Sequence, residues 1–180
     1  MAEQESSLLS QKIAYVDLTQ GTVTTEVVPL EWRHKFIGAR GINMYLLSRL
    51  TKADTDPMGP DNPFIVGVGL LTGSPGFGSR YNITGLSTAH GRSRDRGNIG
   101  DSNIGGHFGA ELKYTGFDHL VITGQSPVPV YLLVRNDSIE IRDARRFWGM
   151  DTWEVQVAIQ NEHEDERMRV LCIGPAGENL

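Results

Sequence analysis

The chain has 180 residues, of which 39% are hydrophobic and 22% charged, and its formal net charge is -5. These proportions are ordinary for a soluble globular protein, and the acidic balance argues against a dedicated nucleic-acid-binding protein. No apolar stretch approaches the ~20 residues that span a bilayer, and the single cysteine excludes a disulfide framework or a four-cysteine metal cluster. We therefore expect a cytoplasmic protein with no membrane and no nucleic-acid partner.

The first half of the chain alternates between strand-like and helix-like patterns. Residues 1–11 lack the basic and hydrophobic segments of a signal peptide and are predicted to form a polar tail, so the folded domain is expected over 12–180. Alternating and continuous apolar runs predict strands, and apolar residues at helical spacing predict helices. The predicted elements are strands over 12–18 and 22–29, helices ending at Gly38 and spanning 41–50, and strands over 64–71 and 81–88.

The second half is richer in strands and ends without a closing element. The predicted elements are a helix over 107–116, strands over 119–125, 130–137 and 138–144, a helix over 151–163 with Asp151 as its N-cap, and a last strand over 167–175. The order β-β-α-α-β-β-α-β-β-β-α-β predicts an α+β domain of two mixed β-sheets with short helices. Two strand-rich halves with a glycine loop near the middle of each would suit an intertwined duplication, although no strong sequence repeat accompanies them.

Glycine is the unusual feature of the composition. The chain has 21 glycines, about 12% against a usual ~7%. They concentrate in two segments, "LLTGSPGFGSRYNITG" over 70–85 and "GNIGDSNIGGHFGAEL" over 97–112. Glycine lets backbone amides converge on a ligand, and a glycine turn that opens a helix adds the positive end of the helix dipole, which suits phosphate. For any single glycine, close packing of a helix on a sheet is the commoner reason, and neither a Walker sequence nor GxGxxG is present.

Polar residues beside the two glycine segments are candidates for ligand contact. Arg80 could bind a phosphate or a fused heterocycle in bidentate fashion, or it could pair with an acidic side chain. Asn103 could offer its amide, or its carbonyl could reach a divalent cation held by phosphate. Arg40 has a similar but weaker case beside its interpretation as a surface residue. The basic run over 90–97, "HGRSRDRG", is either an anion site or a solvated loop.

Histidine and cysteine give little sign of a site. His107, next to a glycine pair, could face a ligand or simply begin a helix, whereas His34, His119 and His163 are expected at the surface or at an edge. No HExxH spacing occurs, so no metal held by protein ligands is expected. Cys172 lies in an apolar run and is predicted to be a buried structural thiol.

Five segments occur in order along the chain: "IGARGINMYLL", "LLTGSPGFGSRYNI", "SNIGGHFGAELKYTGFDHLVITG", "VYLLVRNDSIEIRDA" and "IGPAGENL". Together they resemble the N-terminal domain of the tungsten-containing aldehyde ferredoxin oxidoreductases. The resemblance runs from about Lys12 to Leu180. It departs from the family pattern at "TAHGRSRDRGNIGDS", where the family usually has a short turn, so the resemblance leaves cofactor contacts in that segment open.

The resemblance implies a cofactor and a set of contacts. The family binds a tungsten (or molybdenum) bis-pyranopterin whose metal is held by dithiolene sulfurs and whose phosphates are bridged by Mg²⁺. Arg80 would face a pterin near an iron–sulfur cluster, and the backbone carbonyl of Asn103 would help to hold Mg²⁺. The cofactor-binding residues implied by the resemblance are Gly78, Ser79, Arg80, Asn103, Gly105 and Gly106.

The resemblance also implies a function for a larger protein. The chain would be the cofactor-binding part of an enzyme that oxidises aldehydes to carboxylic acids, with a ferredoxin-type electron acceptor. The remaining domains, or a partner subunit, would supply the cysteines of a [4Fe-4S] cluster and the acid and base residues, so we assign no catalytic residue here and expect no activity from this chain alone. The alternatives are a non-catalytic or truncated pterin-binding module, and the cofactor domain of a related aryl-CoA reductase subunit.

Overall fold

A computed structural model of the protein describes residues 12–76, 78–89 and 98–179, so the predicted tail over 1–11 and the basic run over 90–97 lie outside the described residues. The centre of the structure is a six-stranded mixed sheet in the order β2-β1-β6-β3-β4-β5, and β7 and β8 form a separate two-stranded antiparallel sheet. The strands are β1 (Lys12–Asp17), β2 (Thr22–Val27), β3 (Phe64–Val68), β4 (Tyr81–Leu86), β5 (Ile99–Ile104), β6 (Phe117–Thr123), β7 (Val130–Arg135) and β8 (Ser138–Asp143).

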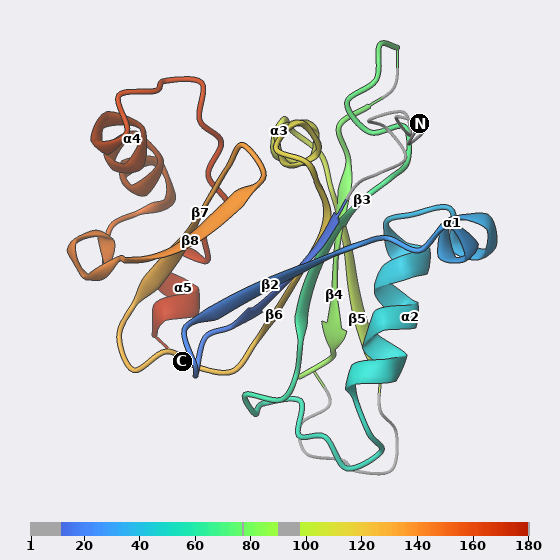
Figure 1. Ribbon diagram of the computed structural model, residues 1–180. Coiled ribbons are helices and arrows are strands. Elements are labelled where there is room, and N and C mark those ends of the chain that lie inside the picture. The colour runs from blue at the N-terminus through green and yellow to red at the C-terminus, as the bar shows by residue number, and fades with distance from the viewer. Residues whose placement is uncertain (1–11, 77, 90–97, 180) are drawn as a thin grey trace.

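The helices are short and lie on both sides of the main sheet (Figure 1). They are α1 (Leu30–Phe36), α2 (Arg40–Leu50), α3 (Phe108–Tyr114), α4 (Thr152–Glu162) and α5 (Gly174–Glu178), with a 3-10 turn over Arg145–Phe147. Asp151 caps α4 as predicted, and Glu154 completes a capping box with it. None of the helices in the described residues has both the length and the apolar character needed to cross a bilayer.

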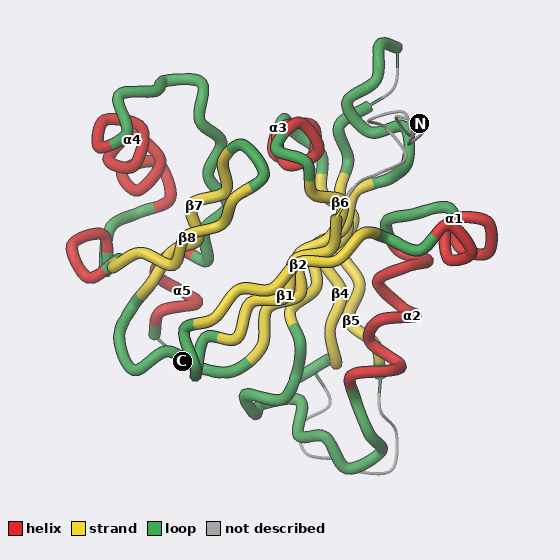
Figure 2. Tube along the Cα trace, in the orientation of Figure 1, coloured by secondary structure: helices red, strands yellow, loops and turns green. Residues whose placement is uncertain are grey.

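The topology confirms the predicted α+β class with short helices and two sheets. Strand β6 pairs parallel to β1 and antiparallel to β3, so it joins the N-terminal hairpin β1–β2 to the β3-β4-β5 meander. Figure 2 shows the separate β7–β8 hairpin beside this sheet. Both glycine-rich segments adjoin the main sheet, one between β3 and β4 and one over β5 and the start of α3.

Alternation along the central strands divides the core between the two faces of the main sheet. On one face Ile13, Ile65 and Val121 pack beneath Ile42 and Leu46 of α2. The other face carries its own cluster, which α3 and the β7–β8 hairpin cover: Ala14, Val66, Val68, Tyr81, Leu112, Phe117, Leu120, Val134 and Ile139. Burial on both faces explains the nearly continuous apolar runs of β3 and β6.

One buried carboxylate joins three of these elements. Asp118 of β6 accepts from Arg33 Nη1 of α1 at 2.8 Å and from Lys113 Nζ of α3 at 2.8 Å. The three side chains are 1–3% exposed. Lys113 Nζ also donates to the carbonyl of Gly69 at 3.3 Å, just after β3. Asp118 thus ties α1 and α3 to the sheet, and Lys113 ties α3 to the first glycine-rich segment.

Strand β5 is missing from the sequence-based prediction, which assigned residues 97–106 to a glycine loop. It is an edge strand of the main sheet, opposite β2, and pairs antiparallel with β4, from Leu86↔Ile99 to Tyr81↔Ile104. Its side chains are partly or fully exposed, so no hydrophobic alternation marks it. An edge strand needs backbone pairing on one side only, which Gly100 and the polar residues permit.

The predicted last strand over 167–175 is also wrong. No described strand pairs with this segment, and α5 begins at Gly174. The apolar alternation that suggested a strand instead places Met168, Val170 and Cys172 against the third core cluster, beside α4 and β7. Cys172 is half-buried rather than buried, and burial, followed by the nearby charge of Glu178, raises the pKa of its thiol.

We predict that Asp118→Asn lowers the free energy of unfolding by roughly 3–5 kcal/mol, because it leaves two buried cations without their shared anion. Urea denaturation of the purified chain measures the change. The control is Asp137→Asn, which breaks an exposed pair with Lys12 (3.1 Å) and should cost less than about 1 kcal/mol. Equal losses in the two variants would contradict the role given to Asp118.

Candidate cofactor site

The two glycine-rich segments lie against each other at one end of the main sheet. The segment after β3 runs into β4 through Ser79 and Arg80, and the turn after β5 runs into α3 through Gly105 and Gly106. Ser79 Oγ donates to the carbonyl of Gly106. Gly109, in the first turn of α3, packs so closely that an added Cβ would lie 3.3 Å from the carbonyl carbon of Arg80 and closer still to Ser79 O. The structure therefore brings together the six residues that the resemblance singled out.

The glycines of this region fall into two groups. At Gly67, Gly85 and Gly109 an added Cβ would collide with protein atoms, so close packing explains them. At four others an added Cβ would meet no described atom within 4 Å; these are Gly76, Gly78, Gly105 and Gly106. Positive φ explains Gly76 (+81) and Gly106 (+94), but neither φ nor packing against described residues explains Gly78 or Gly105. The second group forms a surface of open backbone. Any residue other than glycine at these positions would place a side chain in that space.

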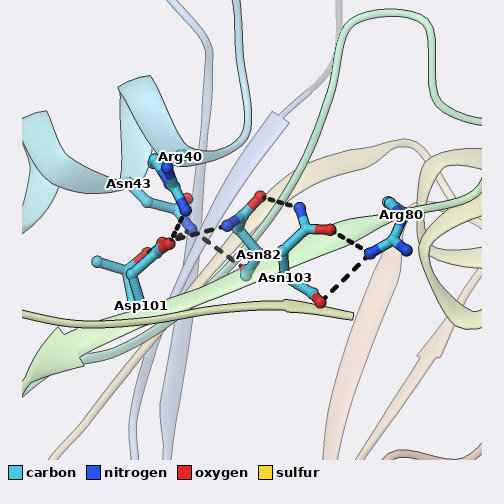
Figure 3. Close-up of polar contacts among 7 residues, drawn as sticks. Arg40, Asn43, Arg80, Asn82, Asp101 and Asn103 are labelled. Carbon is cyan, nitrogen blue, oxygen red and sulfur yellow. Dashed lines mark hydrogen bonds and ion pairs between the residues drawn. The ribbon is translucent and has the colours of Figure 1, made fainter. Parts of the chain in front are cut away.

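Arg80 stands at the edge of this open backbone. Its side chain is exposed, and Nη1 donates to Asn103 Oδ1 at 2.5 Å and lies 3.4 Å from the Asn103 carbonyl oxygen (Figure 3). Among the described residues, Arg80 contacts Asn103 and pairs with no acidic side chain, so the ion-pair interpretation gains no support in that part of the chain. Its positive charge is therefore available to an anion that approaches the open glycines.

Arg40 is different, because it is bonded to Asp101 of β5. Its side chain is 62% exposed, which confirms the interpretation as a surface residue. Asp101 also accepts from Asn82 Nδ2 at 3.1 Å, and Asn103 Nδ2 donates to Asn82 Oδ1 at 3.0 Å. A row of polar side chains thus connects the two arginines, from the start of α2 to the open backbone (Figure 3).

The row continues into the interior beneath α2. Asn43 Nδ2 donates to Thr84 Oγ1 at 3.2 Å and to the Asn82 carbonyl at 3.3 Å, while Asn43 Oδ1 contacts His119 Nδ1 at 2.8 Å. Because Oδ1 can only accept, His119 carries its proton on Nδ1. Gly67 provides the room, since an added Cβ there would lie 2.5 Å from His119 Nδ1.

The surface prediction for His119 is therefore wrong. Its side chain is 0% exposed, and burial, together with the positive charges of Arg33 and Lys113, lowers its pKa to about 3. His163 is also more buried than predicted, with a side chain that is 7% exposed and contacts Tyr131. His34 is exposed as predicted, and His107 is exposed at the start of α3.

The site offers binding groups rather than an acid–base pair. Open backbone, a guanidinium without an acidic partner in the described part of the chain, and the Asn103 amide suit a flat ligand that carries negative charge. Within the described ranges, no three histidine, cysteine, aspartate or glutamate side chains gather in a way that could hold a metal ion. Sequence reasoning missed Asn82 and Asp101; their only signal is their position on two strands that the structure pairs.

Comparison with known proteins identifies relatives over nearly the whole chain. Residues 13–180 match the model of the aldehyde ferredoxin oxidoreductase N-terminal domain. The tungsten-containing aldehyde ferredoxin oxidoreductase of Thermococcus kodakarensis is 42% identical over 166 residues, which are 92% of this chain and 26% of that protein. The Pyrococcus furiosus enzyme of the same name is 39% identical with the same coverage. This chain therefore spans about a quarter of the length of these curated relatives.

Two further similarities concern proteins whose names indicate other reactions. The WOR-like subunit of an aliphatic sulfonate oxidoreductase from P. furiosus is 32% identical over 184 residues, covering 93% of this chain and 28% of that subunit. Among solved structures, the active site complex BamBC of benzoyl coenzyme A reductase, in complex with 1,5-dienoyl-CoA, matches with a TM-score of 0.88 and 32% identity. That match covers 96% of this chain and 26% of the other.

The two groups of glycines make opposite predictions for alanine substitution. We expect Gly109→Ala to lower the free energy of unfolding by roughly 1–3 kcal/mol, because its Cβ meets the backbone of Ser79 and Arg80. Gly105→Ala, which meets open space at an ordinary φ, should stay within about 0.5 kcal/mol of wild type or gain slightly. Urea denaturation of both variants is the measurement, and a costly Gly105→Ala would show that its surface is not open.

The buried His119 predicts a stability that falls as the solution becomes acidic. His119 takes up a proton near pH 6.5 in the unfolded chain but only near pH 3 in the folded chain. The stability that neutral His119 contributes is therefore complete above about pH 6.5 and is lost progressively as the pH falls from there toward 3. The slope from this group is at most ~1.4 kcal/mol per pH unit. Urea unfolding between about pH 7 and 4.5 should show a shallower slope for His119→Gln than for wild type. His34→Gln, at an exposed site, should keep the wild-type slope; a steep slope in His119→Gln would exclude His119 as the cause.

Proposed function

The chain belongs to the aldehyde ferredoxin oxidoreductase family through its N-terminal domain, and from this premise we propose that residues 12–180 form the base of a metal–pterin site in a larger oxidoreductase. The observation that carries the proposal is the open backbone at Gly78, Gly105 and Gly106 beside the guanidinium of Arg80, which pairs with no acidic side chain among the described residues. Neither positive φ nor close packing against described residues accounts for Gly78 and Gly105, whereas a flat ligand lying on the backbone would account for both.

The residues present fit a tungsten (or molybdenum) bis-pyranopterin. Backbone without Cβ atoms lets a planar pterin approach closely, and Ser79 braces the two glycine segments by its bond to Gly106. Arg80 would contact pterin or phosphate oxygens, for which a planar guanidinium is well shaped. The backbone carbonyl of Asn103 would help to hold Mg²⁺, and the cofactor's phosphates would supply the negative charge that both this ion and the nearby Arg80 need.

When bound, the cofactor would supply the oxygen-transfer and electron-transfer chemistry. The residues of this chain would bind and orient it and set its electrostatic surroundings. The positive charge of Arg80 would stabilise negative charge on a ligand bound beside it. No described side chain at this site is placed as a general acid or base.

For the complete protein we propose oxidation of aldehydes to carboxylic acids with a ferredoxin-type acceptor, in the cytoplasm. The similarity to enzymes of that name at 37–42% identity supports this reaction. The remaining domains, or a partner subunit, would contribute a [4Fe-4S] cluster and the rest of the cofactor contacts, because this chain spans about a quarter of such proteins. The isolated chain should therefore have no aldehyde-oxidising activity.

A second function is the reduction of an aryl-CoA thioester on the same cofactor base. The structural match to BamBC supports it. Viologen-dye reduction by the complete protein with a panel of aldehydes, and dye-driven turnover with aryl-CoA thioesters, separate the two reactions. A complete protein that binds the cofactor and turns over neither class would favour a non-catalytic pterin-binding module.

We predict that Arg80→Ala in the complete protein lowers cofactor retention roughly tenfold, the factor that one hydrogen bond to a charged group supports. Tungsten and molybdenum by plasma mass spectrometry, and pterin by fluorescence after oxidation, measure occupancy. Arg142→Ala is the matched control, because that arginine pairs with Glu140 on the separate hairpin. Wild-type occupancy in Arg80→Ala would remove Arg80 from the cofactor contacts.

A further inference from the structure

Four side chains form a single line of hydrogen bonds across β4 and β5. Asp101 Oδ1 accepts from Asn82 Nδ2 at 3.1 Å, Asn82 Oδ1 accepts from Asn103 Nδ2 at 3.0 Å, and Asn103 Oδ1 accepts from Arg80 Nη1 at 2.5 Å. Figure 3 shows the line, which we call the amide relay. Asn82 and Asn103 are direct partners in the strand register, so the backbone pairing itself sets the two amides side by side.

The relay can run in one direction only. A carboxylate can only accept hydrogen bonds and a guanidinium can only donate them, whereas each amide has one end of each kind. Asp101 therefore obliges Asn82 to turn its NH₂ group toward it, which leaves Asn82 Oδ1 for Asn103. Asn103 must in turn offer its NH₂ group to Asn82, and its Oδ1 is left to face Arg80.

We propose that Asp101 is a positioning residue, which acts through Asn82 and Asn103 to hold the guanidinium of Arg80 beside the open backbone. The inference rests on the proposed function in one respect, namely that Arg80 contacts the cofactor. Asp101 itself does not reach the ligand in this scheme. It fixes the orientation of two amides, and the second amide fixes the arginine.

The start of the relay is itself firmly held. The Asp101 side chain is 13% exposed; Arg40 of α2 binds its Oδ2, and Thr84 Oγ1 lies 3.4 Å from its Oδ1. Asn82 is 4% exposed, and its backbone carbonyl accepts from the buried Asn43. Only the last two members, Asn103 and Arg80, are exposed. Through the relay, the mostly buried carboxylate of Asp101 restricts the side chain of Arg80, which would otherwise sample many rotamers at the surface.

Replacement of Asp101 by asparagine keeps the shape of the side chain but removes the acceptor-only group that sets the direction of the hydrogen bonds along the relay. An amide at position 101 can keep its oxygen for Arg40 and turn its NH₂ group toward Asn82. Both downstream amides then reverse, and Asn103 presents NH₂ to the guanidinium, which is a contact between two donors. Arg80 loses its anchor in that arrangement, although no residue that touches the ligand has changed.

The test uses the complete protein isolated with its cofactor. We expect Asp101→Asn to speed the loss of tungsten or molybdenum and of pterin roughly threefold to tenfold during dilution into cofactor-free buffer, the range of one typical hydrogen bond. Asn82→Ser, which interrupts the relay and leaves the Arg40–Asp101 pair intact, should have a similar effect and gives a second variant should the first not fold. Asp143→Asn is the matched control, since Asp143 pairs with Arg145 on the separate hairpin. Thermal unfolding midpoints show whether each variant is folded.

A double-mutant cycle with Arg80→Ala separates positioning from general stabilisation. If Asp101 acts through Arg80, Asp101→Asn adds little to the loss rate in the Arg80→Ala background. An effect of the same size in both backgrounds, or wild-type retention in Asp101→Asn and Asn82→Ser while Arg80→Ala releases the cofactor, would overturn the relay and leave the proposed function standing. Wild-type retention in Arg80→Ala would instead overturn the cofactor contact on which both depend.

Discussion

The buried carboxylate of Asp118 is the interaction on which the arrangement of the domain depends. Near the start of β6, it pairs with Arg33 of α1 and Lys113 of α3. Lys113 also donates a hydrogen bond to the carbonyl of Gly69. The positive charges of Arg33 and Lys113 also help burial to keep the nearby His119 neutral. A buried pair of this kind contributes little net stability but is costly to break, so its main effect is to specify one packing of α3. The candidate cofactor site depends on that packing, because α3 brings the second glycine segment against the first.

The site itself is made from backbone, and its glycines serve two separate purposes. Gly109 lets α3 rest on residues 79 and 80, which closes the two segments on each other. Gly78 and Gly105 leave open surface at the same place without any conformational need. Gly109 therefore allows the two segments to pack together, whereas Gly78 and Gly105 leave the resulting surface free of side chains. Because a sequence shows only that both are glycine, the distinction rests on the coordinates, where the neighbours of each missing Cβ can be examined.

Sequence patterns predicted what is local and buried, and missed what depends on pairing. The apolar runs of β1, β3 and β6 and the cap of α4 could be recognised because burial and capping have local signatures. Strand β5 has no buried face, so nothing in its sequence marked it as a strand. His119 was expected outside because only the sheet register sets it against Gly67, beneath Asn43 of α2. The clustering of Arg80 and Asn103 followed from the resemblance, whereas Asn82 and Asp101 became visible only once β4 and β5 were paired.

The two amides between Asp101 and Arg80 have an electrostatic reason as well as a geometric one. A carboxylate in direct contact with Arg80 would hold the guanidinium equally well, but it would cancel the positive charge and repel an anionic ligand. Asn82 and Asn103 transmit the direction of the hydrogen bonds while they keep the negative charge of Asp101 away from Arg80. Arg40 pairs with that charge at the other end of the relay. Arg80 is thereby ordered and still uncompensated among the described residues, the combination that recognition of a phosphorylated, planar ligand requires. A neutral relay anchored on a distant carboxylate is one of the few arrangements of side chains that provides both.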